Sequence, residues 1–239
     1  MTGPSHQPID CHDTVASGIY TYAMESFEEL LKLAEIAHGH LCAGQILGVR
    51  MATLGCRRLG IDEPRGKDRK RLVAFVEIDR CATDAIGVVT GCRLGKRALK
   101  FRDWGKMAAT FVDLESGRAL RIAALESSKA RARELYPEIE NKNKQQMKAY
   151  RELPDGDLFS EEWVSVQIEA KEFPGYKGER ICCAVCGEGI SYERFIERDG
   201  QTLCYACADP RACYYQPLGS SIESVTEEVA IIGPRCECP

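Results

Sequence analysis

The stretch that decides the fold of this chain is HGHLCAGQILGVRMATLGCRRLG, residues 38–60. It opens with three potential metal ligands within five residues: His38, His40 and Cys42. The apolar residues that follow predict a helix over residues 43–59. Glycines at positions 44 and 48 predict that another backbone approaches this helix closely. A closely packed helix is therefore expected to start directly after a His/Cys cluster.

The flanking segments predict a mixture of helices and strands. Upstream, residues 26–29 form a capping-box pattern that opens a helix, and this helix stops at residues 38–40. Downstream we expect a buried strand at 72–78, a helix at 81–90 closed by Gly91, strands at 99–104, 107–114 and 119–125, one charged helix at 127–150 bent at Pro137, and a strand at 163–170. The fold class predicted is α+β, with helices packed on a mixed or antiparallel sheet.

Composition and charge narrow the class of protein. The 239 residues are 44% hydrophobic and carry a net charge of −4, which suits a globular protein with a core of its own. Residues 171–239 hold 7 Lys and Arg against 11 Asp and Glu, which counts against nucleic acid as the main partner. We found no secretory signal pattern and no apolar run of membrane-spanning length, so we expect a soluble, cytoplasmic protein.

Four cysteines near the C-terminus have the spacing of a structural zinc site. Two CxxC pairs are separated by 17 residues, and four thiolates form the closed tetrahedral shell that zinc prefers. We predict a zinc ribbon over residues 181–210, with the ligands Cys183, Cys186, Cys204 and Cys207. Two separate redox-active CxxC pairs, or iron in place of zinc, are the alternatives. The adjacent Cys182 could compete as a ligand, but the direction expected for the two side chains makes Cys183 the ligand we predict.

A second group of ligands lies in the predicted core domain. Besides His38, His40 and Cys42, Cys81 starts the next predicted helix and Cys92 follows its end. Cysteines at helix starts lie at the positive end of the helix dipole, which favours the thiolate form. Thiolates and imidazoles from several elements are typical of a transition-metal site. The alternative is that these side chains are ordinary core cysteines and hydrogen-bonded histidines.

Three motifs in this order closely resemble the FmdE family of formylmethanofuran dehydrogenase proteins. They are HGHLCAGQILGVRMA at 38–52, CATDAIGVVTGCRLGK at 81–96 and GKMAATF at 105–111, and the resemblance spans roughly residues 25–170. Residues 181–210 are similar to the TraR/DksA-type zinc finger that many members carry. Family members often have proline after the cysteine of the first motif, where this chain has Ala43.

The resemblance implies a metal site and a class of partner. His40, Cys42 and Cys81 are implied as the main members of a core site that binds a second transition metal, expected to be zinc, with His38 and Cys92 as neighbours. The implied partner is a molybdenum or tungsten enzyme of one-carbon redox chemistry, and no pterin cofactor is expected in this chain. Asp84 is a candidate for orienting a ligand, and Lys96 and Lys106 for binding an anionic group, with solvated surface roles as the alternative.

The predicted organisation has five parts. They are an N-terminal arm at 1–24, the FmdE-like core at 25–172, a linker at 173–180, the zinc ribbon at 181–210 and a tail at 211–239. A homodimer is expected, and the tail cysteines Cys236 and Cys238 could complete a metal site on a neighbouring chain. The roles of Cys11 and Cys213 stay open.

Three functions are compatible with these patterns. The first is an accessory metalloprotein or component of an oxidoreductase of the formylmethanofuran dehydrogenase type. The second is a free-standing enzyme that uses an open metal or an activated Cys42, with His40 and Cys81 as further catalytic candidates. The third is an adaptor whose zinc ribbon binds a protein partner. A metal bound beyond the ribbon zinc distinguishes the first two from the third.

Overall fold

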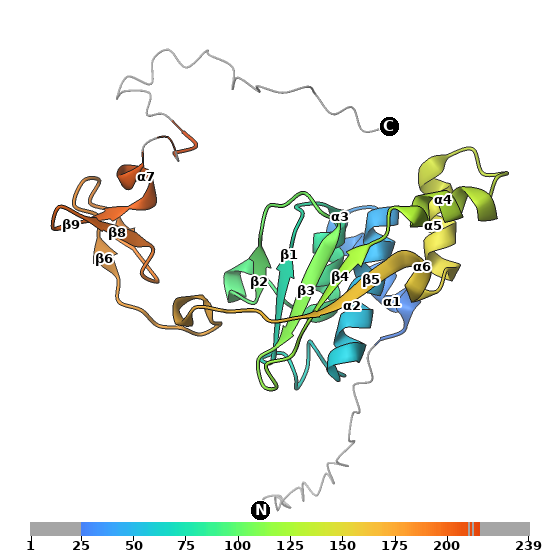
Figure 1. Ribbon diagram of the computed structural model, residues 1–239, viewed down its shortest axis with the longest axis horizontal. Helices are drawn as coiled ribbons and strands as arrows, with labels where there is room; N and C mark the ends of the chain where they lie inside the picture. Colours follow the sequence, from blue (N-terminus) through green and yellow to red (C-terminus); the bar gives the residue numbers. More distant parts are fainter. Residues whose placement is uncertain (1–24, 210, 212, 216–239) are drawn as a thin grey trace, which may run out of the picture. The chain divides into compact units, whose positions relative to one another are not determined.

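The computed structural model describes residues 25–209, 211 and 213–215. The chain divides into two compact units, which we describe separately (Figure 1). The first contains the residues up to Glu169 together with Phe173–Gly175, and the second contains Ala170–Glu172 and the residues from Tyr176 onward. Within the described ranges, no helix is long and apolar enough to cross a membrane.

The first unit is an α+β fold built on one mixed sheet, as predicted. Its strands have the order β2-β1-β3-β4-β5; β1 and β2 are parallel and the other pairs are antiparallel. The elements in chain order are α1 (Phe27–His38), α2 (Ala43–Leu59), β1 (Leu72–Val76), α3 (Cys81–Thr90), β2 (Leu99–Phe101), β3 (Ala108–Asp113), β4 (Ala119–Ala124), α4 (Ser127–Leu135), α5 (Lys142–Glu152), α6 (Asp155–Leu158) and β5 (Phe159–Val164).

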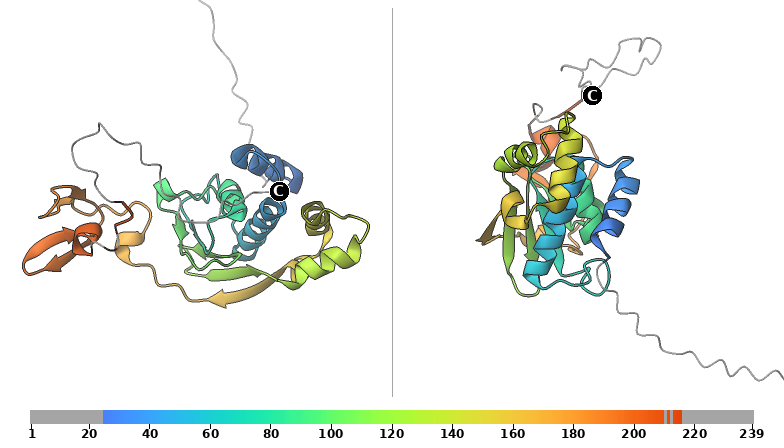
Figure 2. Two further views of the ribbon diagram at one scale, coloured as in Figure 1. Left: turned by 90° about the horizontal axis from the view of Figure 1, so that it is seen from above. Right: turned by 90° about the vertical axis from the view of Figure 1, so that its right-hand side faces the viewer.

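The two faces of the sheet pack against different parts of the chain. Alternate side chains of β1 and β3, such as Ala74 and Phe111, belong to the main core, which they share with α1, α2 and α3. These helices lie on one side of the sheet (Figure 2, left). The opposite face carries Val73, Phe75 and Val112, and the chain following β5 packs against it. The helical face therefore contains most of the core and the ends of the helices that carry the candidate ligands.

Helix α2 is the central element of the main core. A Cβ atom added at Gly48 would lie 2.5 Å from the carbonyl oxygen of Ala82 on α3, and one at Gly55 would lie 2.5 Å from the ring of Phe111 on β3. The predicted close approach at position 48 is therefore observed, and α3 is the element that approaches. Contact with both α3 and the sheet fixes the position of the first turn of α2, where the ligand cluster begins.

Two sequence-based boundaries were wrong. The segment 127–150 is not one bent helix: α4 ends at Leu135, and α5 starts afresh with Asn141 as its N-cap, whose side chain accepts a hydrogen bond from the Lys144 N–H at 3.0 Å. The predicted strand at 163–170 is instead β5 at 159–164. The alternating apolar residues that suggested it, Val164, Val166 and Ile168, contact the second face of the sheet.

The second unit is a small module with two hairpins and a short helix. It contains β6 (Ile181–Cys182), β7 (Gly189–Ile190), β8 (Phe195–Arg198), β9 (Gln201–Cys204) and α7 (Tyr205–Ala208), after a 3-10 turn at Ala170–Glu172. β6 pairs with β7, and β8 pairs with β9. Its buried apolar core consists of Cys183, Ile190, Leu203 and Ala208. So small a core supplies little stability by itself.

Candidate metal centres

The first centre lies where α1 ends and α2 begins. The ligand atoms of His38, His40 and Cys42 all lie within 4.8 Å of one another. The ring centroids of the two histidines are 4.8 Å apart. His38 and Cys42 are half-buried and His40 is exposed. The group is therefore accessible to a metal ion and to a further ligand from solvent.

Local backbone geometry produces this convergence. The α1 helix stops because Gly39 adopts the left-handed conformation, with φ of 95°, and its N–H donates to the Glu35 carbonyl oxygen. Cys42 is the extended N-cap residue of α2. The Ala43 N–H donates to Asn143 Oδ1 of α5 at 3.3 Å, a bond that a proline at this position could not make. The turn thus returns His40 and Cys42 to the end of α1.

Cys81 adjoins this group through helix α3. It is the first residue of α3, and the Cys42 sulfur lies close enough to influence the pKa of the Cys81 thiol. A Cβ atom at Gly44 would lie 3.1 Å from Cys81 Cβ and 3.7 Å from Cys42 Sγ, so the absent side chain gives both sulfurs room. Cys81 is not one of the three atoms that lie mutually within 4.8 Å. The sequence-based prediction had Cys81 as the third main ligand and His38 as a neighbour. In the structure, His38 is the third member of the tight group.

Two polar side chains hold the centre in place. Asp84 Oδ2 of α3 lies 2.8 Å from His38 Nδ1, the position expected for a carboxylate that orients a metal-bound histidine. Gln45, fully buried on α2, donates from Nε2 to the Cys81 carbonyl oxygen at 2.8 Å. Its Oε1 atom is buried and has no partner among the described residues. The surroundings of the centre therefore retain an unused buried acceptor.

The expected easy ionisation of Cys81 is not observed. Burial, and then the neighbouring Cys42 sulfur, raises the pKa of the Cys81 thiol above its ordinary value. Two adjacent sulfurs cannot both ionise cheaply without a positive charge beside them. A divalent cation supplies that charge, so the donor set fits a transition metal.

Other candidates lie away from the cluster. Cys92 is buried beyond the far end of α3, where its Sγ lies 3.5 Å from the Leu72 carbonyl oxygen, and burial raises the pKa of this thiol. It is therefore not a neighbour of the His/Cys group. Lys96 lines a separate cavity near that end of the helix. Lys106 Nζ lies over the ring of Trp104, 5.7 Å from its centroid.

The second centre lies in the C-terminal unit. The sulfurs of Cys183, Cys186, Cys204 and Cys207 lie within 4.8 Å of one another, which fits a four-thiolate zinc ribbon. The two pairs are presented differently: the first lies in the turn between β6 and β7, and the second at the start of α7, where Cys204 is the N-cap. Cys182 is exposed and lies outside the group.

Hydrogen bonds prepare the four sulfurs for a cation. Backbone N–H groups of Cys186 and then Cys204 point at Cys183 and lower the pKa of its thiol to about 6. The side-chain hydrogen bond with Cys204, and then burial, raises the pKa of the Cys207 thiol to about 12. Protons shared among close sulfurs are what a divalent ion displaces when it binds. Cys213 donates instead to the Tyr215 carbonyl oxygen at 3.2 Å, and Cys11, Cys236 and Cys238 lie outside the described residues.

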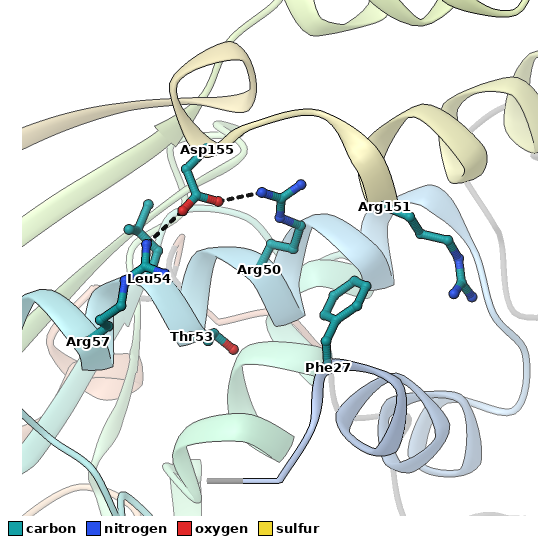
Figure 3. Close-up of a pocket in the computed structure, with 7 residues that line it drawn as sticks. All are labelled: Phe27, Arg50, Thr53, Leu54, Arg57, Arg151 and Asp155. Atoms are coloured by element: carbon teal, nitrogen blue, oxygen red, sulfur yellow. Dashed lines mark hydrogen bonds and ion pairs between the residues drawn. The ribbon is translucent and has the colours of Figure 1, made fainter.

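A small pocket of about 220 Å³ beside α2 contains none of these ligands (Figure 3). Asp155 accepts hydrogen bonds from Arg50 at 2.5 Å and from Arg57 at 2.7 Å. Arg151 points away from them and pairs with Glu28 at 2.7 Å (Figure 3). Each arginine of the pocket has a carboxylate partner, so these contacts fasten α6 and α1 to their neighbours.

Sequence reasoning missed two residues of the core centre. Gln45 carried a usable signal, because it is a polar side chain within the apolar stretch of α2. Asn143 carried none, because it is 100 positions from Ala43 in the sequence and reaches it only through the packing of α5 in the fold.

These features define an α+β protein with two groups of side chains suited to holding a metal ion. A family model described as "FmdE, Molybdenum formylmethanofuran dehydrogenase operon" matches residues 37–160, about half of the chain. The chain belongs to this FmdE family, as its three motifs predicted.

Two individual proteins are similar to this chain. A crystal structure of an FmdE-like protein of the tungsten formylmethanofuran dehydrogenase type, from Syntrophus aciditrophicus, superposes with a TM-score of 0.55 and 21% identity, over 79% of this chain and 95% of the other, which supports the fold. A probable S-adenosyl-L-methionine-binding protein of Archaeoglobus fulgidus is 30% identical over an alignment of 215 residues, which covers 81% of this chain. The chain spans only 55% of the length of that relative.

Proposed function

We propose that this chain is an accessory metalloprotein of a one-carbon redox enzyme in the cytoplasm. The core centre binds one transition metal ion, zinc by preference, through His38, His40 and Cys42. The C-terminal unit binds one structural zinc. The observation that carries the proposal is the convergence of two imidazoles and a cysteine sulfur within 4.8 Å at an accessible helix junction.

The donor set supports an open site in the core and a closed one in the C-terminal unit. Three protein ligands leave a coordination position free, as in catalytic zinc sites, whereas four thiolates complete a structural shell. Asp84 and Gln45 are suited to holding His38 and Cys81 in position. A free position at an accessible metal can take water, a substrate group or a ligand from a partner protein.

The family description supports the class of partner. It names the operon of molybdenum formylmethanofuran dehydrogenase, and the similar solved protein is described as FmdE-like, of the tungsten enzyme. We propose that this chain associates with an oxidoreductase of that type and acts as a homodimer. Affinity-tagged chain should recover such an enzyme from native extract, and light scattering of the purified chain should give twice the chain mass.

A free-standing enzyme is the second candidate. It is favoured by the pair of adjacent sulfurs, since Cys81 lies beside Cys42 without belonging to the tight ligand group. A metal-bound Cys42 with a second thiol at hand is suited to thiol chemistry. S-adenosylmethionine is the first ligand to test, because the Archaeoglobus relative is described as probably binding it. Turnover by the isolated chain would favour this candidate over the accessory role.

Cobalt substitution tests the core centre directly. Co²⁺ replaces zinc in such sites, and its absorption spectrum reports how many thiolates bind it. We expect Cys42→Ser to remove one cobalt ion and its thiolate band while the four-thiolate spectrum of the C-terminal unit remains. The matched variant Cys186→Ser should do the opposite. A wild-type spectrum of the four-thiolate site alone would contradict the proposal and favour an adaptor role for the C-terminal unit.

A further inference from the structure

Beyond the metal centres, we propose that the core domain binds a phosphorylated small molecule in a cavity lined by Arg65, Arg69, Lys70, Arg93 and Lys96. The cavity has a volume of about 580 Å³, within the range of small-molecule sites. It lies beside Gly91, the C-cap of α3, whereas Cys81 begins that helix. Ten helical residues span about 15 Å, so this cavity and the metal centre are separate sites.

Four of the five cations around the cavity form no ion pair with a carboxylate of the described residues. Of the five, Arg65 alone forms an ion pair among the described residues, with Glu25. Lys70, Arg93 and Lys96 have none within that part of the chain. Positive charges that line one cavity repel each other, and a bound anion offsets this unfavourable electrostatic energy. In a chain of net charge −4, such a cluster indicates an anion site.

Carboxylates on the neighbouring segments form ion pairs with other cations. Arg71 pairs with Asp68 at 3.1 Å, Asp113 at 2.9 Å and Glu115 at 2.8 Å. Lys67 pairs with Glu63 at 3.2 Å. These acids therefore do not neutralise the remaining cations of the cavity.

The backbone holds several of these cations in fixed positions. The Arg93 carbonyl oxygen accepts hydrogen bonds from the N–H groups of Lys96 at 3.2 Å and of Ala98 and Leu99 at 3.3 Å. These bonds order the short 3-10 helix Leu94–Lys96, of which Arg93 is the N-cap. A Cβ atom at Gly91 would lie 3.1 Å from Arg65 Cγ, so glycine there lets the arginine stem pack against the chain. The backbone that carries these cations is thus ordered before a ligand binds, which lowers the entropic cost of binding.

The lining also indicates what the ligand carries besides phosphate. Leu72, Ala98 and Leu114 contribute apolar surface between the cations. Arginine and lysine bind phosphate oxygens through charge-assisted hydrogen bonds, while apolar surface suits a ring or hydrocarbon part. A nucleotide-like diphosphate has both features, and ADP is the probe we choose.

Isothermal titration of the full chain with ADP, inorganic pyrophosphate and adenosine tests this site at fixed ionic strength. We expect one ADP per chain, weaker binding of pyrophosphate, which lacks the ring, and no binding of adenosine. The double variant Arg93→Gln/Lys96→Gln should weaken ADP binding about tenfold or more, because it removes two phosphate contacts. Both side chains are exposed, so the variant should fold, and its circular dichroism spectrum checks this.

Two controls separate binding in this cavity from binding elsewhere on the chain. Lys142→Gln/Lys144→Gln removes the same charge from exposed positions on α5 and should leave ADP affinity unchanged. Cys42→Ser should also leave it unchanged, which excludes nucleotide binding through the core metal. The proposal is overturned if wild type binds neither ADP nor pyrophosphate saturably, or if the Arg93/Lys96 variant binds ADP as tightly as wild type. Equal affinity for pyrophosphate and ADP would overturn the assigned role of the apolar surface.

Discussion

Asp84 Oδ2 lies 2.8 Å from His38 Nδ1, and this contact joins α3 to the last turn of α1. With Nδ1 bonded to the carboxylate, the Nε2 atom of His38 is the nitrogen left for a metal ion. The His38 side chain is 18% exposed and that of Asp84 is 55% exposed, so the pair lies at the edge of the centre. The carboxylate thus sets both the tautomer and the orientation of the histidine.

The first prediction concerns this carboxylate. Asp84→Asn should lower the metal affinity of the core centre about 10- to 100-fold, because the amide no longer holds the His38 ring as a charged acceptor. Competition with a chromophoric chelator measures the affinity. Asp62→Asn, at an exposed loop position, is the matched control and should have no effect. Unchanged affinity in Asp84→Asn would mean that His38 does not depend on this contact.

The contact between α2 and α3 provides the second prediction. Gly48→Ala should destabilise the core by about 1–3 kcal/mol, because its Cβ would meet the Ala82 backbone at 2.5 Å and 2.8 Å. Fluorescence of the two tryptophans, Trp104 and Trp163, reports urea unfolding of this unit. Gly156→Ala has open space around its Cβ position and should be nearly neutral. Equal stability of both variants would contradict the close packing.

A third prediction follows from the acid Asp113 on β3. Burial alone would raise the pKa of this carboxyl, but hydrogen bonds from Arg71, then Ser116 and the Glu115 N–H, outweigh it and lower the pKa to about 2. The contribution of Asp113 to stability is therefore complete above its unfolded pKa near 4 and is lost as the pH falls toward 2.

Comparison with Asp113→Asn isolates this effect. The stability difference between wild type and variant should shrink by about 2 kcal/mol between pH 5 and pH 2, as the wild-type carboxyl takes up its proton. Urea unfolding followed by tryptophan fluorescence measures it. A difference that stays constant over that range would show that Asp113 has an ordinary pKa.

The fourth prediction concerns metal removal from the C-terminal unit. Its buried core comprises only Cys183, Ile190, Leu203 and Ala208, so we expect its folding to depend on a bound metal ion. Cys207→Ser should make residues 181–208 sensitive to protease while residues 25–169 stay resistant. Mass spectrometry of the fragments locates the cuts. Cys182→Ser, which alters an exposed thiol outside the cluster, should be as resistant as wild type; equal resistance of Cys207→Ser would contradict the prediction.

Local signals made much of the fold predictable. The capping box at Ser26 and Glu29 is present at the start of α1, and α2 and α3 have the predicted bounds, with Gly60 and Gly91 as their C-caps. These features depend on neighbouring residues, which a sequence displays directly. The break between α4 and α5 was also encoded, by Pro137 and the N-cap Asn141, but the charged pattern on both sides concealed it.

The composition of the core centre was less predictable, because it depends on tertiary packing. The sequence indicated His40 and Cys42, but whether His38 or Cys81 joins them is decided by the turn at Gly39 and by where α3 packs. Cys92 seemed close because it follows the same helix, yet ten helical residues place it far from Cys81. The lining of the basic cavity comes from four separate segments of the chain, so among its cations only Lys96 was indicated as a candidate for binding an anion.

The metal content of freshly purified protein, measured element by element, tests the central claim most directly. Wild type should contain two transition-metal ions per chain, Cys42→Ser one, Cys186→Ser one, and the Cys42→Ser/Cys186→Ser double variant none. Cys182→Ser should match wild type. One ion per chain in wild type, unchanged by Cys42→Ser, would contradict the claim that His38, His40 and Cys42 form a metal centre.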